Sequence, residues 1–280
     1  MTIVAVWYEP QDKLLWAVAD TRISQRGQSG GVIVSTESGA KLLPLPVVCR
    51  VLGQDDGFLV APYYTSNVGF VFAGSALAAG QTYLTAVTLL QNLATLGVKN
   101  PPVLKDIAEL VRRLAERFCR EVLSGAAGGH GTFEACIFAW CQHNKRYEIH
   151  TLKPDNDAGH FAIKMTSCVP RDEDDVVLLG SGAKEFRTRL AEIRKTGDAT
   201  GRKLRAPKLA VEAMIREESV DDVGGSLSIG FCSEHNFNLC SWVSPKVMGQ
   251  PAARRTLNGI DLDTEVGLVG DLIVAGVGVP

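Results

Sequence analysis

Apolar residues form two short runs at the start of the chain. Residues 2–8 read Thr-Ile-Val-Ala-Val-Trp-Tyr and residues 14–19 read Leu-Leu-Trp-Ala-Val-Ala, with a Glu-Pro-Gln-Asp turn between them. This pattern predicts a β-hairpin that brings its far end, at Asp20, back beside Thr2. Because the first run is apolar on both alternating faces, we expect its strand to be covered on both sides.

Helical periodicity occurs in two separate pairs of segments. Apolar side chains recur at three- and four-residue steps over residues 75–96, and again over residues 103–122 after a Pro-Pro pair. A second pair follows at about residues 183–195 and 207–218. Each pair predicts two consecutive amphipathic helices that cover one face of a sheet.

The remaining apolar segments are short and typical of strands. Pro44 and Pro46 indicate an edge strand or an interrupted strand, and the Gly- and Ser-rich residues 25–40 and the polar residues 196–205 predict irregular chain. The order strands, two helices, strands, two helices, strands favours an α+β fold with two antiparallel sheets between helix layers. The further strands are expected at residues 42–51, 68–73, 133–140, 147–152, 161–167, 176–179, 226–232 and 238–243.

The composition favours a folded chain with a large core. Hydrophobic residues make up 46% and charged residues 21%, and the net charge is −2. This balance gives no general attraction for nucleic acid or anionic membranes, so we expect neither as a partner. Without a signal-type start or an apolar run long enough to span a membrane, a cytoplasmic location is expected. The seven cysteines lie mostly in apolar segments and are expected to be buried thiols, with no metal site and no cofactor.

Thr2 carries the most specific chemistry in the sequence. If Met1 is removed, Thr2 has both a hydroxyl and a free α-amino group, which together form a nucleophile and a base. The unperturbed pKa of an α-amine is about 7.7–8.0, which suits a general base at neutral pH. A small second residue permits removal of the methionine, so we expect no other maturation step.

Several short motifs accompany Thr2 in a fixed order. They are Asp20-Thr21-Arg22, Gly39-Ala40-Lys41-Leu42, Gly74-Ser75 at the start of one helix and Gly180-Ser181-Gly182 before another. Over residues 2–243 this order resembles the proteasome β-subunit family of N-terminal nucleophile (Ntn) hydrolases. The resemblance implies a four-layer αββα sandwich over residues 1–243. Residues 244–280 are then a C-terminal extension, and we expect it to pack on its own or a neighbouring subunit.

The resemblance implies roles for five residues. Thr2 would attack a peptide carbonyl, while Lys41 favours the attacking alkoxide and Asp20 keeps Lys41 charged and oriented. Gly74 would offer a backbone N–H to the oxyanion. Ser181 would bind the α-amine and the catalytic water.

Supporting residues follow from the same resemblance. Arg22 is expected to pair with a buried carboxylate or with backbone carbonyls. The family aspartate is displaced, so either Asp221 or Asp222 would take its place, and Val223 stands where the family has serine. In this departure the chain resembles divergent bacterial homologues more than the archaeal or eukaryotic subunits.

Ser24, Phe72 and Ala76 would bind substrate. The bulky Phe72 would favour small or medium apolar side chains before the cut bond.

The function implied by the resemblance is that of a threonine-type endopeptidase subunit. Its partners would be a peptide or unfolded-protein substrate, further copies of the chain in a self-compartmentalising ring or double ring, and an unfoldase. Two alternatives stay open: a catalytically inactive shell protein of the same kind, and a non-proteolytic amidase on the same fold.

Overall fold

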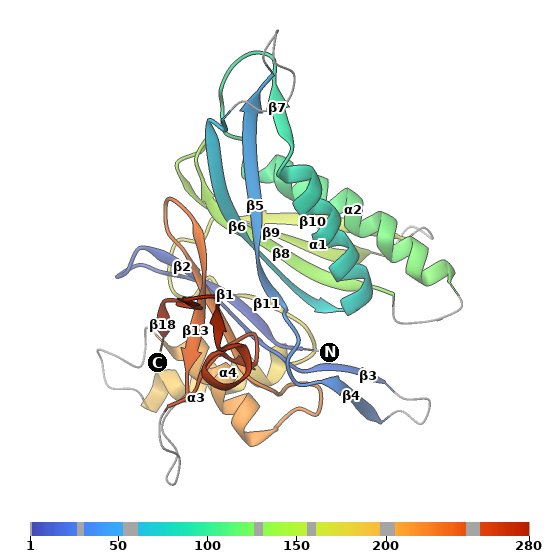
Figure 1. Cartoon of the computed structure of the whole chain (residues 1–280). Coiled ribbons are helices and arrows are strands. Elements are labelled where there is room, and N and C mark those ends of the chain that lie inside the picture. The colour runs from blue at the N-terminus through green and yellow to red at the C-terminus, as the bar shows by residue number, and fades with distance from the viewer. Residues whose placement is uncertain are drawn as a thin grey trace. The chain divides into compact units, whose positions relative to one another are not determined.

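The computed structural model describes residues 2–26, 31–52, 61–125, 131–155, 161–196, 205–244 and 253–279. The chain forms two compact units. Unit 1 comprises residues 1–43, 171–231 and 239–280, and unit 2 comprises residues 44–170 and 232–238. Both units combine strands with helices, so the fold is mixed α and β, with several sheets (Figure 1). Met1 and most of the predicted loop at residues 196–205 lie outside the described residues.

Unit 1 is built on a sheet with the strand order β11-β1-β2-β12-β13-β14-β15, in which β18 also pairs with β13. Strands β1 and β2 are antiparallel with Val4 opposite Ala19, which confirms the predicted hairpin. The strands are β1 Val4–Glu9, β2 Leu14–Asp20, β11 Val177–Leu179, β12 Leu227–Cys232, β13 Phe237–Val243, β14 Arg255–Leu257, β15 Ile260–Asp261 and β18 Gly278–Val279.

Helices α3 (Ala183–Thr196) and α4 (Ala206–Glu217) pack on this sheet. Their apolar side chains form one core with alternate residues of β1 and with residues of β2, β12 and β13. Fully burying a large apolar side chain contributes about 1.5–3 kcal/mol, so this core holds β1 firmly in place. Core members include Ile3, Ala5, Trp7, Phe186, Leu190, Val211 and Met214.

The described positions within residues 25–40 are more regular than the sequence predicts. Strands β3 (Ile23–Arg26) and β4 (Val32–Thr36) form a separate antiparallel ribbon. The β-branched residues of β4 favour extended chain, a signal that the surrounding glycines and serines obscure. The Gly39 N–H donates to the Thr21 carbonyl (2.7 Å), and this bond returns the chain to the end of β2 just before Lys41.

The C-terminal residues of unit 1 are partly paired and partly exposed. Strand β18 runs parallel to β13, with Val279 opposite Trp242. Between β15 and β18 lie the π-helix η1 (Leu262–Val266) and a small hairpin of β16 (Leu268–Val269) and β17 (Leu272–Ile273). The four residues of that hairpin expose their apolar side chains. The expected division between residues 243 and 244 stays a prediction.

Unit 2 holds a second sheet with the order β10-β9-β8-β6-β5-β7. Helices α1 (Ala76–Leu90) and α2 (Leu104–Ser124) pack on each other and on this sheet (Figure 1). The strands are β5 Leu42–Val51, β6 Tyr64–Gly74, β7 Leu93–Thr95, β8 Phe133–Cys141, β9 Arg146–Asp155 and β10 Ala162–Cys168.

Helix α1 ends at Leu90, six residues earlier than its predicted end, and the short strand β7 follows. The Asn92 side-chain amide donates to the Thr88 carbonyl (2.7 Å), which satisfies a carbonyl of the last helical turn. The next residues then pair with β5 from Cys49 onward. Because β7 does not reach Pro44 and Pro46, these prolines occupy a stretch of β5 that β7 leaves unpaired, as predicted for an edge.

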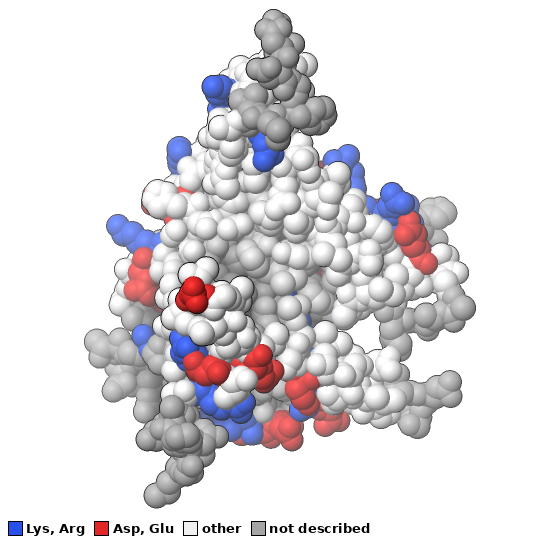
Figure 2. Space-filling view, viewed as in Figure 1, with Lys and Arg blue, Asp and Glu red and all other residues white. Residues whose placement is uncertain are grey.

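Basic and acidic side chains are interspersed on the face that Figure 2 shows, and neither sign predominates there. Within the described part of the chain, no helix is both long and apolar enough to cross a membrane.

Candidate active site

Three segments of unit 1 bring Thr2, Asp20 and Lys41 together. Thr2 lies two residues before β1, and Asp20 is the last residue of β2. The antiparallel pairing places Asp20 opposite Ile3, whose carbonyl accepts a hydrogen bond from the Asp20 N–H (3.3 Å). Lys41 directly precedes β5. We call these three residues the Thr2 cluster.

The side chains of the Thr2 cluster are joined by direct hydrogen bonds. Thr2 Oγ1 donates to Asp20 Oδ1 (2.8 Å), and Lys41 Nζ donates to the same Oδ1 (2.9 Å). Lys41 Nζ also lies in hydrogen-bond contact with Thr2 Oγ1. The Ile3 N–H adds a further donor to Asp20 Oδ1 (3.0 Å). The hydroxyl oxygen of Thr2 is therefore held between an amine and a carboxylate.

All three side chains of the Thr2 cluster are buried. The exposed fractions of the residues are 1% for Thr2, 0% for Asp20 and 3% for Lys41. Burial lowers the pKa of the Lys41 amine from its ordinary value, and the neighbouring Asp20 carboxylate opposes this shift. A lysine whose pKa is lowered releases its proton more readily than a surface lysine, so it is suited to exchanging a proton with the hydroxyl.

A backbone contact that the sequence does not reveal completes the surroundings of Asp20. The Gly224 N–H donates to Asp20 Oδ2 (3.2 Å), so both carboxylate oxygens are engaged. The Gly224 carbonyl in turn accepts from the Arg22 N–H (3.0 Å). A Cβ at position 224 would lie 2.3 Å from Arg22 Cζ, so only glycine allows the Arg22 side chain to pack here without a shift.

The Arg22 side chain lies outside the Thr2 cluster and binds two carboxylates. Its Nε donates to Glu37 (3.0 Å) and its Nη2 to Glu218 (3.1 Å), while Nη1 donates to the Asp221 carbonyl (3.0 Å). The two carboxylates are exposed, whereas the sequence predicted either a buried carboxylate or backbone carbonyls, and the Asp221 carbonyl is a partner of the second kind. The hydrogen bonds with Glu37 and Glu218 raise the pKa of Arg22, so the guanidinium stays charged.

The two candidate aspartates differ in position. Asp222 is buried, accepts a hydrogen bond from Ser24 Oγ (3.2 Å), and favours the charged form of Lys41. Asp221 is exposed and contributes its carbonyl to Arg22. The structure therefore places Asp222, with Ser24, near the Thr2 cluster.

Ser181 lies in the turn between β11 and α3 and is exposed. The contact with Thr2 is made by its neighbour, because the Gly182 N–H donates to the Thr2 carbonyl (3.3 Å). Among the described residues, no hydrogen bond joins the Ser181 side chain to Thr2. Its expected roles toward the α-amine and the water stay predictions.

Gly74, Phe72 and Ala76 belong to unit 2. Gly74 has φ +118°, and a Cβ there would lie 2.7 Å from the Thr132 carbonyl oxygen, so the position requires glycine. Phe72 is buried and its ring packs edge-on against Phe133. Their expected roles in oxyanion stabilisation and substrate binding stay predictions.

The sequence matches no protein-family model and no curated protein. The structure is similar to one from Pseudomonas aeruginosa described as the helical assembly of the Anbu complex, with TM-score 0.54 and 16% identity over 85% of each chain. It is also similar to Anbu, described as an ancestral β-subunit, from Yersinia bercovieri, with TM-score 0.51, 12% identity and coverage of 82% of this chain and 81% of that one. At these identities the similarity shows a shared fold.

These comparisons correct the family that the sequence motifs suggest. The similar structures are Anbu proteins, which are related to proteasome β-subunits but distinct from them. The expected membership of the proteasome β-subunit family is therefore wrong. The motifs that suggested it are short, so they did not separate the two groups.

Proposed function

We propose that this protein is a threonine-type endopeptidase of the N-terminal nucleophile class, with Thr2 as nucleophile after removal of Met1. The observation that carries the proposal is the hydrogen bonding of the Thr2 hydroxyl with both Lys41 and Asp20. A hydroxyl is a weak nucleophile until a nearby group lowers its pKa or accepts its proton. Lys41 and the freed α-amine supply such groups.

The proposed reaction proceeds in two steps. Thr2 Oγ1 attacks the peptide carbonyl as its proton passes to an amine, and the peptide C–N bond breaks when the leaving nitrogen takes that proton. The resulting ester is then hydrolysed by water, which restores the hydroxyl. Asp20 holds the Lys41 amine in place throughout, with both carboxylate oxygens fixed by N–H or O–H donors.

The proposal extends to the arrangement of the chain and of its copies. It includes the four-layer αββα sandwich, a catalytic region over residues 1–243, and a homo-oligomeric ring, with an unfoldase as a further partner. The similar Pseudomonas aeruginosa protein is described as a helical assembly, which supports self-association. The exposed apolar side chains of the β16–β17 hairpin support it too, because contiguous apolar surface marks protein contacts.

The activity is tested with a library of fluorogenic peptides. Thr2→Ala removes the nucleophile and is expected to lower kcat/KM by about 10²–10⁴, whereas Thr2→Ser keeps a hydroxyl and retains more activity. Light scattering checks that both variants keep the assembly mass of the wild type. Equal turnover by the Thr2→Ala variant and the wild type would contradict the proposal.

An inactive shell protein is the alternative function. Val223 in place of a hydroxyl residue and the exposed position of Ser181 favour it. In that case Met1 is retained, and no peptide in the library is cleaved by the wild type.

A further inference from the structure

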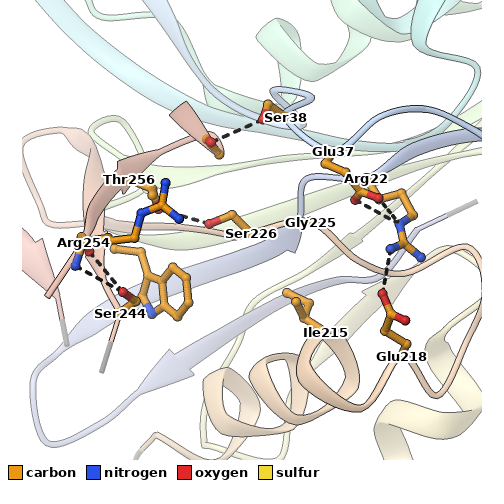
Figure 3. A pocket seen from close by; sticks show the side chains of 12 residues that line it. Arg22, Glu37, Ser38, Ile215, Glu218, Gly225, Ser226, Ser244, Arg254 and Thr256 are labelled. Atoms are coloured by element: carbon orange, nitrogen blue, oxygen red, sulfur yellow. Dashed lines mark hydrogen bonds and ion pairs between the residues drawn. The ribbon is translucent and has the colours of Figure 1, made fainter. Parts of the chain in front are cut away.

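Unit 1 contains a cavity that the proposed catalysis does not use. Its volume is about 420 Å³, within the range of small-molecule sites. It lies between the C-terminal end of α4, the Gly224–Gly225 turn and strand β14, and no member of the Thr2 cluster lines it. We call it the Arg254 cavity. Figure 3 shows Arg254 on one side of it, Arg22 and Glu218 on the opposite side, and Ser226 and Ile215 between.

One end of the Arg254 cavity offers donors to an anion. Among the described residues, the Arg254 guanidinium has one partner, Asp261, which it binds through Nε (3.0 Å). Asp261 also accepts the N–H groups of Asp263 (2.9 Å) and Thr264 (3.0 Å). The Arg254 hydrogen bond, together with these two, lowers the pKa of Asp261 to about 2. The Asp261 carboxylate thus accepts hydrogen bonds from three donors, of which Arg254 is one. The Nη groups of Arg254 stay available for a carboxylate.

The opposite end of the Arg254 cavity carries an excess of negative charge. Glu37 and Glu218 share a single guanidinium, that of Arg22. Among the side chains that the structure describes, two carboxylates beside one guanidinium leave one negative charge without a cation. Glu218 also exposes 70% of its side chain. This end therefore suits an ammonium group, which takes several carboxylate acceptors at once.

The wall between the two ends is partly apolar and partly hydroxylated. Trp242 and Ile215 contribute apolar surface, and the Trp242 indole N–H is fixed by Glu212 (2.9 Å), which holds the ring in one orientation. The Ser226 and Thr256 hydroxyls are hydrogen-bonded to each other (3.1 Å). Such a wall matches a molecule with an apolar side chain and a peptide amide.

We propose that the Arg254 cavity is a binding site for short zwitterionic peptides of two or three residues. The terminal carboxylate pairs with Arg254, the terminal ammonium lies at Glu37 and Glu218, and an apolar side chain packs on Trp242 and Ile215. The polarity of the two ends sets the direction of the bound peptide.

The Arg254 cavity is also connected to Asp20. The Arg22 backbone N–H binds the Gly224 carbonyl, and the Gly224 N–H binds Asp20. A ligand ammonium that draws Glu218 away from Arg22 therefore acts on the turn that holds the carboxylate of the Thr2 cluster. If the proposed peptidase function holds, short products bound here regulate the site that forms them, and this consequence alone rests on the proposed function.

The binding test uses the dipeptide Ala-Leu and calorimetry. The Thr2→Ala variant serves as the protein, so that hydrolysis of the ligand does not interfere. N-acetyl-Ala-Leu lacks the ammonium and Ala-Leu-amide lacks the carboxylate. Each is expected to bind about tenfold more weakly or worse, because each loses a charge-assisted pair.

Three variants locate the site. Arg254→Gln is expected to bind Ala-Leu no better than it binds Ala-Leu-amide, because the variant has lost the partner of the carboxylate. Glu218→Gln, at an exposed position, is expected to bind Ala-Leu no better than it binds N-acetyl-Ala-Leu. Arg255→Gln is the matched control, because Arg255 pairs with Asp263 and does not line the cavity. Absence of Ala-Leu binding, blocked peptides that bind as tightly as Ala-Leu, or an unchanged affinity for Ala-Leu in Arg254→Gln or in Glu218→Gln would overturn the proposal. If the protein binds Ala-Leu but the wild type cleaves no peptide, the binding-site proposal is supported and only the proposed function is contradicted.

Discussion

Replacing Asp20 with asparagine separates charge from shape in the Thr2 cluster. Asp20 is fully buried, and its Oδ1 accepts hydrogen bonds from Thr2, Ile3 and Lys41. Asparagine has nearly the same size, but it leaves the Lys41 ammonium buried without a carboxylate. Its amide NH2 also faces the Gly224 N–H, which now binds Oδ2.

The expected loss of stability follows from the burial of both partners. Removing one member of a buried ion pair costs about 3–5 kcal/mol when the other stays charged. Burial already lowers the pKa of Lys41 and Asp20 opposes the shift, so in Asp20→Asn the pKa of Lys41 falls further. The folded variant then binds fewer protons than the unfolded chain between this lowered pKa and about 10.4, and its stability rises with pH over that window.

Urea unfolding at pH 6 and pH 9, at one protein concentration, measures the effect. Asp20→Asn is expected to lose about 3–5 kcal/mol at pH 6 and clearly less at pH 9. The double variant Asp20→Asn/Lys41→Met is expected to recover most of the loss, because it removes both charges. Asp221→Asn, at an exposed neighbouring position, is the control, with a change within about 0.5 kcal/mol. A deficit of equal size at both pH values, or no recovery in the double variant, would refute the reasoning.

Three further predictions concern other parts of the chain. Gly74→Ala places a Cβ 2.7 Å from a carbonyl oxygen at φ +118°, so it is expected to lower the free energy of unfolding by at least about 1–3 kcal/mol. Gly80→Ala, where a Cβ meets open space, is the control and is expected to be neutral or stabilising in thermal unfolding. The pKa of Asp261 is lowered to about 2 from 3.8, so the stability that its ionised form contributes is lost as pH falls from about 4 to 2. The unfolding temperature of Asp261→Asn is therefore expected to fall less over this pH range than that of the wild type. Cys168 is the one exposed cysteine of the seven, so a thiol reagent is expected to label one site per folded chain, and Cys168→Ser to remove it; rapid labelling of two or more sites would contradict the burial of the others.

The local features of the Thr2 cluster could be predicted from the sequence. The β1–β2 hairpin depends on two apolar runs and one turn, and it fixes Asp20 beside Thr2. The place of Lys41 was predicted from a motif resemblance alone. In the structure it depends on the Gly39–Thr21 hydrogen bond, which brings the chain back to the end of β2 and which composition does not encode.

Other contacts were beyond sequence reasoning because they have no side-chain signal. The Gly224 N–H reaches Asp20 from 204 positions away in the chain, and a backbone donor leaves no residue preference except the glycine itself. The early end of α1 was missed for another reason. Helical periodicity continues past Leu90, but pairing of Leu93–Thr95 with β5 overrides it.

Mass spectrometry of the protein treated with a peptidyl β-lactone tests the assignment of Thr2 most directly. Attack by a hydroxyl opens the lactone ring and adds its full mass to the chain as an ester, with no leaving group. We predict one adduct, located on Thr2 in an N-terminal peptide that lacks Met1, with much slower labelling in Lys41→Met. An N-terminal peptide that retains Met1 and carries no adduct, or labelling at a different hydroxyl such as that of Ser181, would contradict the account.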